Sequence, residues 1–265
     1  MTRRRLDAEL VRRKLARSRE HAGQLITAGR VKVAGQVATK AATQVEPSAA
    51  VVVEETEEGP EYVSRGGHKL AGALAAFPGL VVSGRRALDA GASTGGFTDV
   101  LLRAGASHVV AVDVGYGQIA WSLRTDERVS VVERLNIRDM TPEHVGEPPS
   151  LVVGDLSFIS LTKVLAPIKA CVTPDADYAM MVKPQFEVGK SRVGAGGVVR
   201  DPELRKEAVR TVAEYAGSLG LGVLGVAASP LPGPSGNVEY FLWLKAGAPA
   251  LVEADLARAV AEGPA

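Results

Sequence analysis

The sequence has 265 residues, 46% of them hydrophobic, which allows a sizeable core and excludes disorder over most of the chain. The net charge of +1 is unevenly distributed: residues 1–40 hold eleven Lys or Arg and three Asp or Glu, which leaves about −7 on the remainder. The single cysteine, Cys171, excludes a disulfide framework and indicates a reducing, cytoplasmic location. The four histidines are too scattered for a metal site, and we expect none.

The first part of the chain has the pattern of two short helices followed by short strands. Ser18 is placed to cap the second helix and Gly29 to end it. The alternation from residue 31 to residue 37 around a central glycine predicts a hairpin, and residues 51–53 predict another strand. The helical positions expected to be apolar and inward-facing are Leu6, Leu10, Val11, Leu15, Ala22, Leu25 and Ile26. We therefore predict a small α+β domain over residues 1–58.

Basic side chains cluster on these elements without an apolar patch among them. A solvated basic surface is the ordinary explanation, but the density of the cluster favours contacts with phosphates of a nucleic acid. The candidate RNA-binding residues are Arg5, Arg12, Arg13, Arg17, Arg19, Arg30 and Lys32.

Residues 3–55 resemble the alpha-L RNA-binding module, in which two helices and a hairpin bind structured RNA. The motifs that carry the resemblance are Arg5-Leu6-Asp7, Leu15-Ala16-Arg17-Ser18-Arg19, Ala22, Leu25-Ile26, Gly29, Val31-Lys32-Val33 and Gly35. The resemblance implies that this part of the chain binds RNA. The acidic residues from Glu54 to Glu58 and the turn Gly59-Pro60 then form a connector, so we place a linker at residues 59–63 and a second domain at residues 64–265.

From residue 64 onward, predicted strands and helices alternate. The predicted strands are residues 87–90, 108–114, 129–133, 151–155, 178–182, 222–228 and 240–244. This order predicts an α/β, Rossmann-like fold with a mostly parallel seven-stranded sheet, and ligands at the carboxyl ends of its strands. Ser64 is placed to cap the first helix, which carries Lys69 in its first turns. The uncharged stretch 215–238 is long enough for a membrane span, but its three prolines and several glycines favour a buried strand instead.

Residues 87–97, Ala-Leu-Asp-Ala-Gly-Ala-Ser-Thr-Gly-Gly-Phe, form an apolar strand end, a glycine-rich turn and the start of a helix. Such a turn exposes backbone N–H groups to a cofactor that approaches the main chain closely. The loop lacks the third glycine of the dinucleotide fingerprint, which makes a pyrophosphate the weaker prediction. An acid inside the loop suits the amino group of S-adenosylmethionine, although an ordinary strand-to-helix turn explains the loop equally well. Its candidate cofactor-binding residues are Asp89, Gly91, Ser93, Gly95 and Phe97.

Two further residues extend this prediction. Asp113 ends the next strand, 24 positions after Asp89, at a distance suited to hydrogen bonds with the ribose hydroxyls of an adenosyl group. Asn136 follows the third strand and can accept a hydrogen bond from the adenine amino group through its side-chain carbonyl. A loop cap and a turn Asn are the alternative explanations.

Four charged residues indicate which reaction the cofactor would take part in. Asp155 and Lys183 end neighbouring predicted strands, Lys69 lies in a helix start, and Glu239 follows a loop rich in glycine and proline. A lone Lys at a strand end is usually solvated, but here two lysines and two acids have routes to one pocket. A ribose hydroxyl needs a base to remove its proton, and a neutral Lys can act as that base. The sequence does not distinguish which of the two lysines is the base.

The body of the chain resembles the FtsJ-like, heat-shock-induced ribosomal RNA 2′-O-ribose methyltransferases, whose catalytic set is Lys-Asp-Lys-Glu in this chain order. With its RNA-binding head, the whole chain resembles the TlyA family, some members of which are called haemolysins. The resemblance implies methyl transfer from S-adenosylmethionine to cytidine 2′-hydroxyls in 16S or 23S ribosomal RNA, or both, with Lys69, Asp155, Lys183 and Glu239 as catalytic residues. Two positions depart from the heat-shock enzymes: Phe97 replaces a Trp and Asn136 replaces an acid.

We therefore expect a two-domain ribosomal RNA methyltransferase in the cytoplasm, with ribosomal RNA or ribosomal subunits as its partner and no obligate protein partner. Three rival functions stay open. A small-molecule methyltransferase does not need the basic head, and a non-catalytic RNA-binding protein does not need the four charged residues. A membrane-lysing protein needs an amphipathic or apolar segment, which the sequence does not contain, so we expect no stable membrane insertion.

Overall fold

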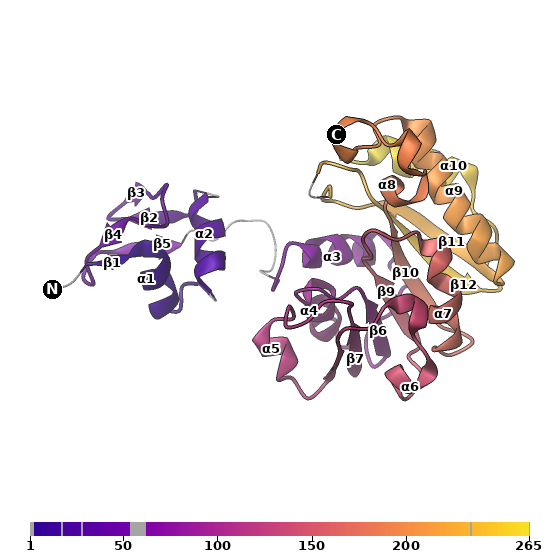
Figure 1. Cartoon of the computed structure of the whole chain (residues 1–265), viewed down its shortest axis with the longest axis horizontal. Coiled ribbons are helices and arrows are strands. Elements are labelled where there is room, and N and C mark those ends of the chain that lie inside the picture. Colours follow the sequence, from indigo (N-terminus) through magenta and orange to yellow (C-terminus); the bar gives the residue numbers. More distant parts are fainter. Residues whose placement is uncertain (1–2, 17, 28, 54–61, 234, 265) are drawn as a thin grey trace. The chain divides into compact units, whose positions relative to one another are not determined.

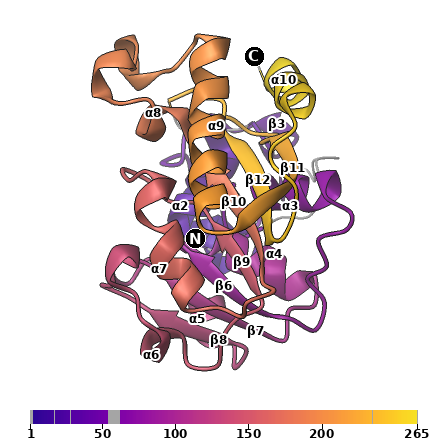
Figure 2. The same cartoon turned by 90° about the vertical axis from the view of Figure 1, so that its right-hand side faces the viewer.

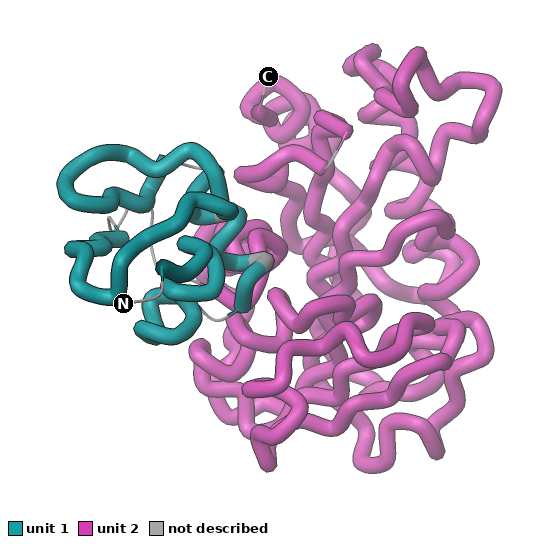
Figure 3. Tube along the Cα trace, turned by 60° about the vertical axis from the view of Figure 1, so that its left-hand side comes forward, with its two compact units in different colours: residues 1–60 teal, residues 61–265 magenta. Residues whose placement is uncertain are grey.

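The computed structural model describes residues 3–16, 18–27, 29–53, 62–233 and 235–264. The chain divides into two compact units, residues 1–60 and 61–265 (Figure 3). The prediction for Arg17 and most of the predicted acidic connector lie outside the described residues.

The first unit is the expected small α+β arrangement. A two-stranded antiparallel sheet joins β1 to β4, a three-stranded antiparallel sheet has the order β3-β2-β5, and two helices complete the unit (Figure 1). Its elements are β1 (Arg4–Arg5), α1 (Leu6–Arg12), α2 (Arg19–Thr27), β2 (Val31–Val33), β3 (Gln36–Val37), β4 (Gln44–Val45) and β5 (Val51–Val53). The Ser18 hydroxyl accepts a hydrogen bond from the His21 N–H at 3.1 Å, which confirms Ser18 as the cap of α2.

Two details of the first unit differ from the prediction. Helix α1 ends at Arg12, so Leu15 is not on the helical face predicted for it. The helix stops there because Lys14 has a left-handed backbone with φ of 60°. Strands β1 and β4 were not predicted.

The second unit holds a seven-stranded sheet with the order β11-β12-β10-β9-β6-β7-β8. Strand β12 is antiparallel to both of its neighbours, and the other adjacent pairs are parallel, which confirms the mostly parallel Rossmann-like sheet. The strands are β6 (Arg86–Ala90), β7 (His108–Val112), β8 (Val129–Val132), β9 (Leu151–Gly154), β10 (Asp177–Val182), β11 (Leu221–Ala228) and β12 (Tyr240–Ala246).

Helices cover both faces of this sheet (Figure 2). Successive residues of a strand point to opposite faces, and in β10 Tyr178 and Met180 belong to one hydrophobic cluster whereas Ala179 and Met181 belong to the other. The helices are α3 (Gly66–Ala76), α4 (Gly96–Arg103), α5 (Trp121–Arg124), α6 (Pro142–Val145), α7 (Leu165–Ala170), α8 (Pro184–Glu187), α9 (Pro202–Ser218) and α10 (Glu253–Glu262). Short 3-10 turns are η1 (Ile137–Asp139), η2 (Leu161–Lys163), η3 (Lys190–Arg192) and η4 (Ala195–Gly197).

The predicted cap of α3 is wrong. Arg65 has helical dihedrals and occupies the capping position without a side-chain hydrogen bond, and Ser64 contributes its backbone carbonyl to the Gly67 N–H at 3.0 Å. The uncharged stretch considered as a membrane span forms the end of α9, strand β11 and the loop after it. Within the described ranges, every helix is too short or too polar to cross a bilayer.

Candidate functional site

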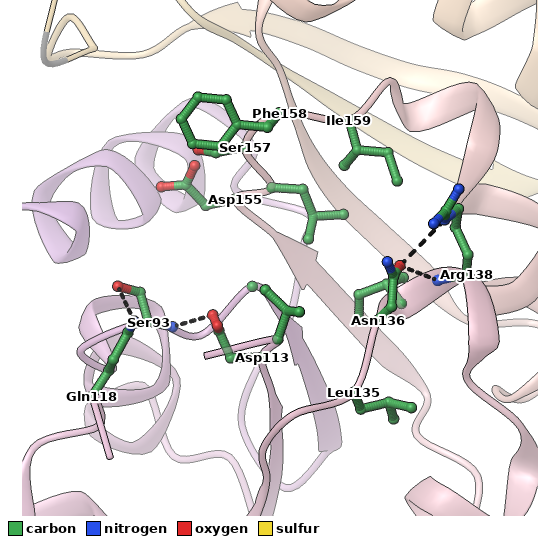
Figure 4. A pocket seen from close by; sticks show the side chains of 14 residues that line it. Ser93, Asp113, Gln118, Leu135, Asn136, Arg138, Asp155, Ser157, Phe158 and Ile159 are labelled. Carbon is green, nitrogen blue, oxygen red and sulfur yellow. Dashed lines mark hydrogen bonds between the residues drawn. The ribbon is translucent and has the colours of Figure 1, made fainter. Parts of the chain in front are cut away.

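Two cavities share a wall at the carboxyl ends of the parallel strands. The larger has a volume of about 610 Å³ and the smaller about 310 Å³. Both are lined by Gly91, Ser93, Asp155 and Ser157, which follow β6 and β9. The larger cavity is further lined by Asp113, Val114, Gln118, Leu135, Asn136, Ile137, Arg138, Leu156, Phe158 and Ile159 (Figure 4). The position is the one expected for ligands of an open α/β sheet.

The glycine-rich loop between β6 and α4 needs its glycines at Gly91 and Gly95. Both have left-handed backbones, with φ of 89° and 95°. A Cβ at Gly91 would lie 2.8 Å from the Asp155 carbonyl oxygen, and a Cβ at Gly95 would lie 2.2 Å from Leu123 Cδ1. A side chain at either position would therefore push the loop away from the strand or helix it packs against.

Asp89, at the end of β6, is fully buried beneath this loop. Its Oδ2 accepts a hydrogen bond from the Thr98 hydroxyl at 2.7 Å, while its Oδ1 is buried without a hydrogen-bond partner. Burial, with a smaller contribution from the negative charges of Asp155 and Asp113, raises the pKa of Asp89 to about 7. A buried carboxyl with one free oxygen is suited to a cationic group of a ligand.

Asp113, just after β7, lines the larger cavity and braces the glycine-rich loop. Its Oδ2 accepts the Ser93 N–H at 2.8 Å (Figure 4), and its Oδ1 accepts the Gly115 N–H at 2.6 Å. These bonds fix the orientation of the carboxylate, and each oxygen retains a second lone pair that can accept a hydroxyl.

Two other predicted cofactor-binding residues, Asn136 and Phe97, are less available to a ligand than Asp113. Asn136 lines the larger cavity, but its Oδ1 accepts the Arg138 N–H at 3.1 Å and so caps η1. The carbonyl proposed for the adenine amino group is thus already engaged. Phe97 lines the smaller cavity and is stacked on Phe241 with ring centroids 6.0 Å apart, so its ring belongs mainly to the core.

The four charged residues form two lysine–carboxylate pairs. Lys69 Nζ lies 2.5 Å from Glu239 Oε2, and Lys183 Nζ lies 2.5 Å from Asp155 Oδ1. Lys183 also donates a hydrogen bond to the Ser157 hydroxyl at 2.9 Å. In both pairs the lysine is buried, with Lys69 5% and Lys183 7% exposed.

The pairs relate differently to the cavities. Lys69, Asp155 and Lys183 all line the smaller cavity, whereas Glu239 is fully buried behind Lys69 and lines neither of the two. Asp155 lines both cavities and therefore lies where a ligand in one meets a ligand in the other. A donor of a small group in the larger cavity and an acceptor in the smaller one can react at this junction.

Comparison with known proteins agrees with this geometry. Residues 62–246 match the FtsJ-like methyltransferase family, and residues 4–51 match the S4 domain. The chain belongs to the FtsJ-like methyltransferase family. The residues that line the two cavities and form the two ion pairs all lie within the part matched to the methyltransferase.

Relatives match almost the whole of this FtsJ-like methyltransferase. The 16S/23S rRNA (cytidine-2′-O)-methyltransferase TlyA of Mycobacterium tuberculosis is 58% identical over 98% of both chains. The 23S rRNA (cytidine-2′-O)-methyltransferase TlyA of Campylobacter jejuni is 35% identical over 69% of this chain and 70% of its own length. The solved structure of a hemolysin from Streptococcus thermophilus, at 36% identity, has a TM-score of 0.77 over 99% of this chain and 96% of that chain.

Several lining residues of the methyltransferase cavities were not predicted. Ser157 contacts Lys183 and lines both cavities, and Leu156, Phe158 and Ile159 extend the wall of the larger one. They follow Asp155 directly, so the end of the strand next to that acid was the available signal. Gln118 comes from a loop without such a signal.

The arginines of the S4 domain are held by two acids. Arg5 and Arg19 each lie 2.9 Å from Asp7 Oδ2. Arg12 and Arg13 lie 2.6 Å and 2.7 Å from Glu9 Oε1. Arg30 and Lys32 flank the start of β2 and are half-buried. Four of the predicted RNA-binding side chains are therefore oriented by ion pairs, which partly neutralise the basic cluster.

Proposed function

We propose that this FtsJ-like methyltransferase transfers a methyl group from S-adenosylmethionine to the 2′-hydroxyl of cytidine in ribosomal RNA. The observation that carries the proposal is Asp155, which lines both cavities and is paired with the buried Lys183. The relatives named as cytidine-2′-O-methyltransferases of 16S and 23S ribosomal RNA support the substrate class. A cytoplasmic location and ribosomal subunits as partners belong to the same proposal.

The residues around the larger cavity fit S-adenosylmethionine. Asp113 lines this cavity, and its oriented carboxylate suits the ribose hydroxyls. Asp89 is fully buried and lines neither cavity, and its unpartnered Oδ1 is the acceptor that we propose for the cofactor's ammonium group. Leu135, Leu156 and Ile159 offer an apolar wall for the adenine. S-adenosylmethionine supplies an electrophilic methyl group on a sulfonium, which needs no acid in order to leave.

The residues of the smaller cavity would act on the ribose. The neutral amine of Lys183 takes the proton from the 2′-hydroxyl, and Asp155 and Ser157 aim that amine through their contacts with Nζ. Lys69 faces the same cavity and orients the ribose or its phosphate, while Glu239 holds Lys69 in place from behind. Because the reaction is an in-line displacement, much of its rate would come from this alignment.

The S4 domain supplies the RNA contact in this proposal. Its guanidinium groups are oriented by Asp7 and Glu9, yet the side chain of Arg19 remains 60% exposed and that of Arg12 47% exposed. Exposed and preoriented arginines are suited to phosphate oxygens of a folded RNA. The domain boundary at residues 59–63 remains a prediction.

The proposal is tested with purified protein, S-adenosylmethionine labelled on its methyl group, and isolated 16S and 23S ribosomal RNA or ribosomal subunits. We expect label in RNA, and a methylated cytidine that blocks alkaline cleavage at its 3′ side. Transfer to a base instead of a ribose would leave that cleavage intact and contradict the proposal. Transfer to a small molecule without RNA would favour the rival function.

A further inference from the structure

Helix α8 begins directly after Lys183 and ends at Glu187, and both of these residues reach the same loop. That loop, residues 155–160, connects β9 to η2 and lines both cavities. The short helix therefore contacts the loop from two points one helical turn apart.

The first point of contact belongs to the catalytic pair already described. Lys183 Nζ lies 2.5 Å from Asp155 Oδ1 and donates a hydrogen bond to the Ser157 hydroxyl at 2.9 Å. These two contacts hold the first half of the loop.

The second point of contact is Glu187, to which neither the sequence nor the proposed reaction assigns a role. The Ser160 hydroxyl donates a hydrogen bond to Glu187 Oε2 at 2.5 Å, and the Leu161 N–H donates one to Oε1 at 2.9 Å. Burial raises the pKa of Glu187 above its ordinary value, and the two hydrogen bonds act in the opposite direction. Both carboxyl oxygens thus fasten the far end of the loop.

Between the two points, the loop contains a residue with a left-handed backbone. Phe158 has φ of 63°, a left-handed conformation that is rare for a non-glycine residue. Its ring packs against Phe186 of α8 with centroids 5.3 Å apart, although the residue is 91% exposed. Helix α8 thus also contacts the middle of the loop, through Phe186.

We propose that Glu187 is a positioning residue for methyl transfer, which fastens Ser160 and Leu161 so that Asp155 and Ser157 meet the amine of Lys183. The inference rests on the proposed function. Glu187 lines neither of the two cavities and touches no reacting group, so its effect passes through the loop.

The test compares Glu187→Ala and Glu187→Gln in the full-length protein, with Glu214→Ala as a control on the exposed surface of α9. Hydrogen exchange of the peptide covering residues 156–162 is measured first, because it does not depend on any reaction. We expect faster exchange in Glu187→Ala than in the wild type and no change in the control. Glutamine keeps an oxygen for the Leu161 N–H and an amide that can donate to the Ser160 hydroxyl, so Glu187→Gln should restore slow exchange.

Methyl transfer to ribosomal RNA is measured on the same variants. We expect kcat of Glu187→Ala to fall by at least about tenfold, with KM for RNA little changed, because a small displacement of aligned groups is costly. Glu187→Gln should retain most of the rate. If Glu187→Ala does not fold, Ser160→Ala removes one of the two hydrogen bonds and should give a smaller change in both measurements in the same direction.

Three outcomes would overturn the inference. Unchanged exchange in the loop of folded Glu187→Ala or Ser160→Ala would show that the carboxylate does not hold it. Faster exchange with an unchanged kcat would show that the hold does not matter for the reaction. An equal loss of rate in Glu187→Gln and Glu187→Ala, with native exchange in the former, would exclude the positioning role. A wild-type protein that binds cofactor but methylates no RNA contradicts the proposed function instead. In that case the exchange experiment still tests whether Glu187 holds the loop.

Discussion

Lys69 and Glu239 are 170 positions apart in the sequence, and their side chains form a buried ion pair with 2.5 Å between Nζ and Oε2. Removing both charges from such a site is often harmless to stability, whereas removing one partner leaves the other uncompensated. The contribution of the pair to the free energy of unfolding can therefore be measured separately from its contribution to methyl transfer.

The first prediction concerns that separation. Glu239→Ala should lower the free energy of unfolding by about 3–5 kcal/mol, because the ammonium of Lys69 then stays buried without a counterion. The double variant Lys69→Met, Glu239→Leu should regain most of this stability and remain inactive. Urea unfolding and methyl transfer are measured on the same samples. A double variant as unstable as the single one would mean that packing around the pair, rather than its charge, explains the loss.

The second prediction separates reaction from cofactor binding. Lys183→Ala should abolish methyl transfer and leave the Kd for S-adenosylmethionine nearly unchanged, because the proposed role of the amine is to act on the ribose hydroxyl. Calorimetry and transfer assays check this, with Lys169→Ala on the exposed side of α7 as the matched control. Equal losses of binding and activity would place Lys183 in the cofactor site, and retained activity would exclude it as the base.

The third prediction follows from the raised pKa of Asp89, which is about 7 in the folded protein against an ordinary value of 3.8. Between these values the folded state binds more protons than the unfolded state, so the free energy of unfolding should fall as pH rises toward 7 and level off above it. Asp89→Asn should remove this contribution to the pH dependence. The measurement is urea unfolding of both proteins from pH 5 to pH 8 without cofactor.

Binding of S-adenosylmethionine should favour the ionised form of Asp89, whereas burial favours the protonated form. A cationic ammonium next to its free oxygen favours the carboxylate, so cofactor binding should tighten as pH rises toward 7 and release a proton below it. Calorimetry in two buffers with different ionisation enthalpies counts that proton. The absence of proton release at pH 6 would argue against contact between this carboxyl and the cofactor.

The fourth prediction is that the second unit binds the cofactor and the first unit binds the RNA. A protein that lacks residues 1–58 should fold and bind S-adenosylmethionine, because the second unit has its own two hydrophobic clusters. It should fail to methylate ribosomal RNA at moderate salt, since we propose that the S4 domain provides the phosphate contacts.

A milder variant supports the same prediction. Neutralising Arg17 and Arg19 together in the full-length protein should weaken RNA binding and reduce its salt dependence, with cofactor affinity unchanged. Truncated protein that modifies RNA at the full-length rate would refute this role of the S4 domain.

The seven strands of the second unit were predictable because each is a short apolar run bounded by turn residues. Strands β1 and β4 have two residues each, too few for alternation to be detectable. The failed cap at Ser64 shows a similar limit, because a hydroxyl before a helix does not reveal whether its side chain or its backbone carbonyl turns toward the helix.

The grouping of the four charged residues was predictable, whereas the hydrogen bonds of individual side chains were not. Chain order and resemblance indicated Lys69, Asp155, Lys183 and Glu239, and the fold brings them together as two ion pairs. The engagement of Asn136 Oδ1 by Arg138 was likewise not predictable, since the capping bond depends on the dihedrals of η1. Side chains that act through local geometry carry little signal in a single sequence.

Strand β12 is antiparallel to β10, so its first residue lies at the same edge as the last residue of its neighbour, where Val182 pairs with Tyr240. Glu239 therefore reaches the site from the beginning of a strand, and Lys183 from the end of one. The pair between Lys69 and Glu239 therefore depends on the insertion of β12 between β10 and β11. The ion pair joins the first helix of the second unit to the strand that is last in chain order in its sheet, so Lys69 gains this counterion only when that strand is in place.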